Sequence, residues 1–355
     1  MRALLEAGRT FVVAAVLAAV LGPAARAADG PALADRAASS RALLARIEPS
    51  ADLQAQLDRF IEARLAADPD LRRAEVRVAV LDLGDPDAPR LAHWHGDAPI
   101  YPASVVKFVY LMAAYAFQQE ARLRIDEPLD HALEQMIRVS SNQATQEVFA
   151  RLTGAAPGPP LPPGAYAEFR DRRLGVERWL QSLGITDLHT VNPTYDGGGD
   201  ITGREEQFLS DRDVPGGLPS ASGEFSNRTA MTATGTARLL ALLATDRALG
   251  PEDSATVRRR MRRDSREQRH LAARIAGGAE RVGGLETYAK SGTWGPIYAD
   301  AGIVRHPSGR EIVVVVFTEA SPHYRGDFIA DLTEAAARRW LAAPAPSAQP
   351  SGASQ

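Results

Sequence analysis

The amino-acid sequence predicts an α+β fold in which an antiparallel sheet is flanked by helices and joined to an all-helical lobe. Three observations lead to this prediction: strand patterns occur only towards the two ends of the chain, the middle is helical, and one middle helix is too apolar to keep a face in water. Strands from both ends then pair into one sheet, and the helices between them form a second lobe beside it.

The first elements are a helix and two strands. Apolar residues recur at helical spacing over Leu53–Leu65. The segment Val76–Leu81 alternates in the manner of a strand and is followed by the turn Gly84-Asp85-Pro86. Residues Arg90–His95 can therefore return as its hairpin partner.

The middle of the chain predicts the helical lobe. Ser104–Gln118 is a thick apolar stretch and predicts a buried central helix. Further helices are expected at about 127–137, 142–152 and 174–183. Prolines between 157 and 163 predict a stiff loop, and the Gly-, Asp- and Ser-rich segment 193–227 predicts a functional loop or an insertion.

The C-terminal part returns to strands. Helices at about 231–245 and 252–273 are expected to lead into strands Leu285–Thr293, Ala299–His306 and Glu311–Thr318. The run Val313–Val316 indicates a fully buried strand. A helix over Phe328–Leu341 closes the fold, and the tail after Ala342 is expected to be disordered.

The composition is that of a globular protein without a nucleic-acid partner. The chain has 355 residues, of which 45% are hydrophobic and 24% charged, and it has no Cys. Its net charge of −3 leaves no positive surplus to neutralise a phosphate backbone. No third ligand accompanies His93 and His95, so we expect no metal and no cofactor.

The N-terminus has the parts of a secretory signal. Arg2 and Arg9 precede the apolar run Phe11–Leu21, and Ala25-Arg26-Ala27 follows as a small-residue cleavage site. The run is too short to span a bilayer, so we expect an exported protein, periplasmic or secreted, without membrane attachment after cleavage. An uncleaved membrane anchor is the alternative. The expected divisions are a signal peptide (1–27), a mature N-terminal extension (28–50), one globular domain (51–341) and a tail (342–355).

Two lysines stand out because the chain otherwise uses arginine. Of 41 basic residues, only Lys107 and Lys290 are lysines. A buried lysine can lose its proton and act as a base, whereas arginine stays protonated. Ser104 lies three residues before Lys107, on one face at the start of the buried helix, which places a nucleophile within reach of a base. The alternative is a chance match of common residues.

Two further short motifs accompany this pair. Lys290 is followed by Ser291-Gly292-Thr293 on a predicted strand, and Ser140-Ser141-Asn142 begins a predicted helix, where a plain N-cap is the alternative. Taken together and in this order, the motifs resemble those of the serine β-lactamase and penicillin-binding D,D-peptidase superfamily, whose signature is S-x-x-K, S-x-N and K-[ST]-G. The resemblance spans about 53–341 and is strongest for the class A β-lactamase branch.

The resemblance implies a role in acyl transfer for each motif residue. Ser104 would be the acylated nucleophile, Lys107 its base and Ser140 the proton relay to the leaving nitrogen. Substrate contacts would come from Asn142 to the acyl-side amide, and from Lys290, Ser291, Gly292 and Thr293 around the substrate carboxylate. The backbone N–H groups of Ser104 and Thr293 would form the oxyanion hole. The expected partner is a small-molecule β-lactam or a peptidoglycan peptide, bound by a monomer.

The sequence departs from the class A pattern where the deacylation base should be. The motif E-x-x-L-N is absent, and Asn192-Pro193-Thr194-Tyr195-Asp196 stands in its place. Asp196 is the nearest carboxylate; Asp200, Glu205, Glu206 and Glu224 lie farther along, where solvated loop charge is the alternative for all five. The interval of 36 residues from Ser104 to Ser140 is also shorter than in class A.

Three functions therefore remain open from the sequence. One is an exported class A β-lactamase-like serine hydrolase that forms an acyl-enzyme with carboxylate-bearing amides. The others are a D-alanyl-D-alanine carboxypeptidase-type cell-wall peptidase and a non-catalytic β-lactam-binding protein.

Overall fold

The structure is a computed structural model that describes residues 30–214, 218–219, 225–320 and 324–341. The signal peptide predicted for residues 1–27 and the tail predicted after Ala342 lie outside these residues.

A seven-stranded sheet joins the two ends of the chain, as the α+β prediction requires. Its strands lie in the order β1-β3-β2-β11-β10-β9-β8, and every pair is antiparallel except β1 and β3. The strands are β1 (Glu48–Pro49), β2 (Glu75–Asp82), β3 (Arg90–Trp94), β8 (Arg262–Arg263), β9 (Glu286–Trp294), β10 (Ile297–Arg305) and β11 (Glu311–Glu319). The N-terminal hairpin β2–β3 adds to the C-terminal strands through β2 and β11, which confirms the fold class.

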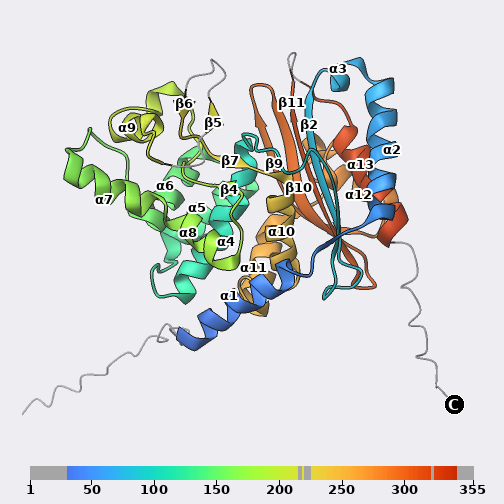
Figure 1. Cartoon of the computed structure of the whole chain (residues 1–355), viewed down its shortest axis with the longest axis horizontal. Helices are drawn as coiled ribbons and strands as arrows, with labels where there is room; N and C mark the ends of the chain where they lie inside the picture. The colour runs from blue at the N-terminus through green and yellow to red at the C-terminus, as the bar shows by residue number, and fades with distance from the viewer. Residues whose placement is uncertain (1–29, 215–217, 220–224, 321–323, 342–355) are drawn as a thin grey trace, which may run out of the picture.

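Helices cover both faces of the sheet (Figure 1). The helices α2, α12 and α13 lie on one face, while α10 and α11 lie on the other, between the sheet and a lobe that includes α4 to α8. The helices are α1 (Gly30–Leu44), α2 (Ala51–Ala67), α3 (Pro69–Arg72), α4 (Lys107–Gln119), α5 (Glu127–Arg138), α6 (Asn142–Thr153), α7 (Pro163–Arg173), α8 (Gly175–Leu183), α9 (Arg204–Ser210), α10 (Ala233–Ala244), α11 (Pro251–Met261), α12 (Ile275–Val282) and α13 (Phe328–Ala336). None of the described helices is long and apolar enough to cross a lipid bilayer.

The two most hydrophobic segments, β11 and α4, lie in the interior of the protein, which explains their composition. In β11, Val313 and Val315 pack into the core that contains α4 and α10, while Val314 and Val316 pack into the core under α2 and α13. The four consecutive valines are thus needed because the strand is covered on both faces. Helix α4 is buried from Lys107 through Phe117, so the prediction of a buried central helix is confirmed.

The structure corrects the helix predicted over 252–273. Helix α11 ends at Met261, because the next two residues leave helical geometry and pair with β9 as strand β8. A 3₁₀ turn over Arg269–Leu271 and a separate helix, α12, follow. Tertiary pairing with the sheet here overrides local helical preference.

Two segments predicted as loops contain helices. Pro163, expected to end a stiff loop, instead begins α7, where its fixed φ suits the first helical turn. The segment 193–227 contains α9 and the short strands β5 (Leu218–Pro219) and β6 (Phe225–Ser226). The strands β4 (Leu188–His189) and β7 (Ala230–Met231) pair just outside this segment.

Candidate active site

The first motif lies where the 3₁₀ turn Ala103–Val106 runs into α4. Ser104 is in this turn and half-buried, whereas Lys107 is the first residue of α4 and fully buried. The prediction had placed both residues on one continuous helix. Ala103, directly before Ser104, has a φ of +48°, an unfavourable conformation for a residue with a side chain, and such strain is often found at functional sites.

In the second motif, the two serines have different roles. The N-cap of α6 is Ser141, whose hydroxyl accepts a 3.1 Å hydrogen bond from the amide of Ala144. The capping interpretation therefore applies to Ser141 and not to Ser140. Ser140 has a φ of +59°, and its hydroxyl is left to contact the two lysines.

The hydroxyl of Ser140 lies between the two lysines. Lys107 Nζ donates to Ser140 Oγ at 3.2 Å, to the Ser140 carbonyl at 2.6 Å and to Asn142 Oδ1 at 2.7 Å. Lys290 Nζ donates to the same Ser140 Oγ at 3.0 Å and to the carbonyl of Ser291 at 2.8 Å. The fold thus brings together three motifs, of which the second and third lie 150 residues apart in the sequence.

Burial changes the acid–base behaviour of both lysines. It lowers the pKa of Lys107 to about 7, and the carboxylate of Asp196 partly opposes this effect. Burial, and then the positive charge of Lys107, hold the pKa of Lys290 well below its usual range. Near neutral pH a substantial fraction of Lys107 is therefore an uncharged amine that can accept a proton.

The third motif brings β9 against the turn that carries Ser104. A Cβ atom on Gly292 would lie 2.6 Å from the carbonyl oxygen of Pro102 and 3.2 Å from the backbone nitrogen of Ser104. Only glycine allows this approach without displacing backbone. Ser291 on one side of Gly292 is half-buried and Thr293 on the other is exposed, so the edge of β9 is open beside Ser104.

Arg274 and Asp300 support this edge of β9. Arg274 donates to the carbonyl of Gly292 at 3.2 Å and to Thr293 Oγ1 at 2.6 Å, and its guanidinium stacks 3.6 Å from the Tyr298 ring centroid. Asp300 is buried opposite Ser291, and its carboxylate attracts the positive charges of both Arg274 and Lys290. Arg274 could not be predicted as part of the site, since nothing in the sequence distinguishes one arginine among 39.

Asp196 lies near the site, but its side chain is exposed. The loop that carries it is tied to the second motif, because Asn142 Nδ2 donates to the carbonyl of Tyr195 at 3.1 Å. The amide of Asp196 donates to Asp200 Oδ2 at 2.8 Å, and Gln146 of α6 donates to the same oxygen at 3.0 Å. Asp200 therefore holds the loop against α6.

The interpretation of Glu205 as a solvated loop charge is wrong. Glu205 is 2% exposed and forms a two-pronged ion pair with Arg173, which is fully buried. The hydroxyl of Tyr195 donates to Glu205 Oε2 at 2.6 Å. The charge of Glu205 is therefore neutralised by Arg173, and Glu205 is not a free carboxylate facing Ser104.

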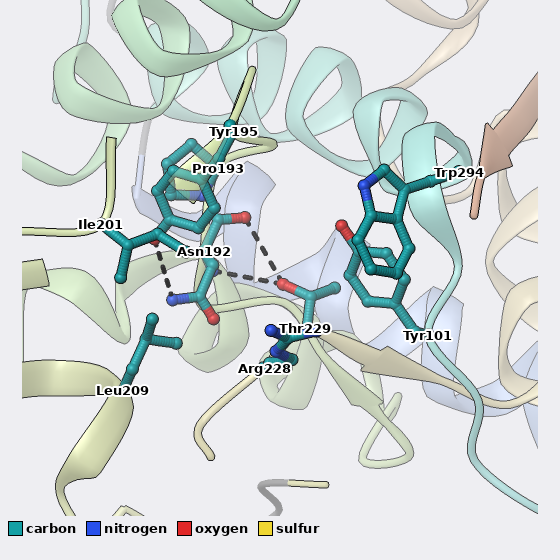
Figure 2. A pocket seen from close by; sticks show the side chains of 10 residues that line it. Tyr101, Asn192, Pro193, Tyr195, Ile201, Leu209, Arg228, Thr229 and Trp294 are labelled. Carbon is teal, nitrogen blue, oxygen red and sulfur yellow. Dashed lines mark hydrogen bonds between the residues drawn. The ribbon is translucent and has the colours of Figure 1, made fainter. Parts of the chain in front are cut away.

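A pocket opens beside the motifs (Figure 2). It has a volume of about 190 Å³ and is lined by Tyr101, Asn192, Pro193, Tyr195, Gly197, Ile201, Leu209, Arg228, Thr229 and Trp294. Tyr101 and Trp294 meet edge to face with their ring centroids 5.7 Å apart. Within the described part of the chain, no group of three or more His, Asp or Glu side chains could hold a metal ion.

Known proteins resemble this chain in sequence over part of its length. Residues 170–340 match the family described as "Beta-lactamase enzyme family". The matched range includes Lys290 and the residues after it, but neither Ser104 nor Ser140. Among curated proteins no match to the sequence is found.

Solved structures share the fold at low identity. A mutant of PBP-A, solved as an acyl-enzyme complex with penicillin G, is 18% identical, with a TM-score of 0.56 over 83% of this chain and 98% of that chain. The β-lactamase from Sphaerobacter thermophilus is 20% identical, with a TM-score of 0.55 over 80% and 98% of the two chains. The TLA-1 extended spectrum β-lactamase is 16% identical, with a TM-score of 0.57 over 81% and 98%. Residues 170–340 are thus similar in sequence to the β-lactamase enzyme family, and the chain shares the fold of β-lactamases and PBP-A.

Proposed function

We propose that this protein is a serine hydrolase that forms an acyl-enzyme on Ser104 with β-lactams or related amides bearing a carboxylate. The observation that carries the proposal is the position of Ser140 Oγ, which contacts both buried lysines at 3.2 and 3.0 Å. Lys107, three residues after Ser104, can act as the base, and the contacts of Ser140 Oγ with both lysines offer a path for the proton.

Acylation can be written with these groups. The uncharged amine of Lys107 takes the proton of the Ser104 hydroxyl while Oγ attacks the carbonyl carbon and the C–O bond forms. The C–N bond then breaks, and the leaving nitrogen receives a proton from Ser140, which regains one from Lys107. A pKa of about 7 suits Lys107 to both halves of this exchange.

The surrounding groups suit substrate binding. Asn142 lies beside Lys107 and would contact the acyl-side amide. Thr293, exposed on the edge of β9, and Lys290 would hold the substrate carboxylate, with the positive charge of Arg274 behind them. The amides of Ser104 and Thr293 would bind the oxyanion.

Deacylation is expected to be slow. A positioned base accelerates hydrolysis of the ester by about 10²–10⁴-fold. Of the three described carboxylates nearest the loop motif, Asp196 faces solvent, Asp200 accepts hydrogen bonds from the Asp196 amide and from Gln146, and Glu205 is paired with Arg173. The adduct should therefore accumulate.

A D-alanyl-D-alanine carboxypeptidase-type activity is the second candidate, and the same observation favours it. An acyl-enzyme that resists hydrolysis after attack on a β-lactam is consistent with an enzyme that turns over a cell-wall peptide. Release of D-alanine from a peptide ending in D-alanyl-D-alanine would distinguish this activity from a non-catalytic β-lactam-binding protein.

Intact-mass spectrometry after incubation with benzylpenicillin tests the proposal. The expected result is one adduct per chain, absent from Ser104→Ala and retained in Ser308→Ala, a control in the exposed turn between β10 and β11. An adduct that persists in Ser104→Ala would remove the assignment of the nucleophile.

We also propose that the protein is exported. The supporting feature is the predicted signal at residues 1–27.

A further inference from the structure

We propose that the pocket of Figure 2 receives the acyl-side substituent of the substrate, and that Arg228 selects substituents that end in a carboxylate. This inference rests on the proposed function and adds a substrate class to it.

The walls of the pocket are continuous with the proposed catalytic groups. Tyr101 lies three residues before Ser104, and Trp294 directly follows Thr293. Tyr195, on the opposite wall, accepts through its carbonyl the hydrogen bond from Asn142. An acyl-side amide held at Asn142 would therefore direct its substituent towards this pocket.

The pocket has room for a substituent and an apolar lining to hold one. A cavity of 150 Å³ accommodates a benzene ring, so about 190 Å³ admits a ring or a short chain. Ile201, Leu209 and Pro193 supply aliphatic surface, and Tyr101 and Trp294 supply aromatic surface. Trp294 is 54% exposed, so part of its ring is free to contact a ligand.

Arg228 is the charged residue in the described lining of the pocket, and its charge is positive. Among the described lining residues there is no Asp or Glu, and no described carboxylate forms an ion pair with Arg228. By contrast, the buried Arg173 is paired with Glu205. Burial raises the pKa of Tyr101, and the positive charge of Arg228, which lines the same pocket, partly opposes this effect.

A second polar group in the wall also lacks a partner. Asn192 is 4% exposed, and its Oδ1 is buried without a hydrogen-bond donor among the described residues. Buried acceptors are nearly always satisfied. Asn192 therefore adds an unpaired acceptor to a wall that is otherwise largely apolar.

A matched pair of penicillins tests the inference. One carries an adipyl side chain, which ends in a carboxylate, and the other carries the monomethyl ester of the same chain. The second-order rate constant for acylation is measured by stopped flow or by mass. For the wild type we expect the free acid to react about ten- to a hundredfold faster, the effect of one charge-assisted hydrogen bond.

Variants then assign the preference to one side chain. Arg228→Gln should bring the two rate constants together, while Arg59→Gln, on the exposed side of α2, should leave the difference intact. Arg228→Glu should instead favour a side chain that ends in an ammonium group. Equal rates on the wild type, or a preference that survives in Arg228→Gln, would overturn the inference.

Benzylpenicillin distinguishes a failure of this inference from a failure of the proposed function. If it acylates the wild type but the carboxylate preference is missing, the inference fails and the proposed function stands. If it gives no adduct, both fail. A melting temperature of Arg228→Gln equal to that of the wild type shows that this variant is folded.

Discussion

At the scale of single residues, burial gives Lys107 a property that arginine would lack. Its ammonium is fully buried and has a pKa of about 7. An arginine buried at this position would stay protonated near neutral pH and could not act as a base. We therefore expect Lys107→Arg to slow acylation nearly as much as Lys107→Ala, measured as a pre-steady-state rate with a chromogenic cephalosporin. Recovery of a large share of the rate in Lys107→Arg would show that only a positive charge is needed.

The pH dependence of acylation follows from the same group. Below pH 7 Lys107 carries its proton and cannot take one from Ser104, so the rate should rise with pH and level off above about 7. The carboxylate of Asp196 stabilises the charged form, and its removal should lower the pKa of Lys107. In Asp196→Asn the midpoint should therefore move to lower pH.

Glu62→Gln, an exposed substitution on α2, is the control for a general change of surface charge. Its midpoint should stay at that of the wild type. A midpoint in Asp196→Asn that also stays unchanged would show that another group governs the profile.

At the scale of elements, the contact between β9 and the 3₁₀ turn before α4 aligns two motifs. Gly292→Ala would put a Cβ atom 2.6 Å from the carbonyl of Pro102 and force the strand and the turn apart. Overpacking of this kind costs about 1–3 kcal/mol of the free energy of unfolding. We expect a lower melting temperature and a larger loss of acylation, because the displaced groups include the backbone nitrogen of Ser104.

Gly164→Ala is the matched control for this substitution. Gly164 lies in the first turn of α7, where a new Cβ would meet no atom within 4 Å. This variant should be neutral or slightly stabilised. If Gly292→Ala also retains full stability and acylation, the close approach of the two elements is not needed.

Elements were predictable where one local pattern determined them. Strand β2 and helix α4 were predicted correctly because the alternating residues of β2 and the continuous apolar run of α4 are both local patterns. Helix α11 was drawn too long because the pairing of Arg262 and Arg263 with β9 is a long-range contact. Helices α7 and α9 were missed because proline and charged residues also suit loops.

At the scale of the whole molecule, the candidate site forms where the helical lobe meets the sheet. Ser104, Lys107 and Ser140 come from the lobe, and Lys290 comes from the sheet. The sequence could identify these residues as motifs, since only two lysines occur. It could not show that Ser140 contacts both lysines, that Glu205 is neutralised by Arg173, or that Arg228 lines a pocket, because each depends on how the lobes pack.

The position of helix α1 gives the last prediction. Helix α1 begins at Gly30 and is anchored to the lobe, since Ser40 Oγ donates to the carbonyl of Arg247 at 3.1 Å and Leu43 is fully buried in the main core. Cleavage near Ala28 would therefore leave the whole of α1 on the exported protein. We expect N-terminal sequencing of the exported form to begin near Ala28.

Thermal unfolding of two shorter chains checks that α1 belongs to the folded unit. A chain that begins at Ala28 should unfold in one transition, and a chain that begins at Ile47, without α1, should unfold at a lower temperature. Leu43→Ala in the longer chain should lose about 2–5 kcal/mol of the free energy of unfolding, the usual effect of emptying a buried leucine site. Equal stability of all three proteins would show that residues 28–46 do not contribute to the folded core. Lower stability of the shorter chain and of Leu43→Ala would show that α1 belongs to the cooperative core, where it contacts α8 and α10 behind the candidate site.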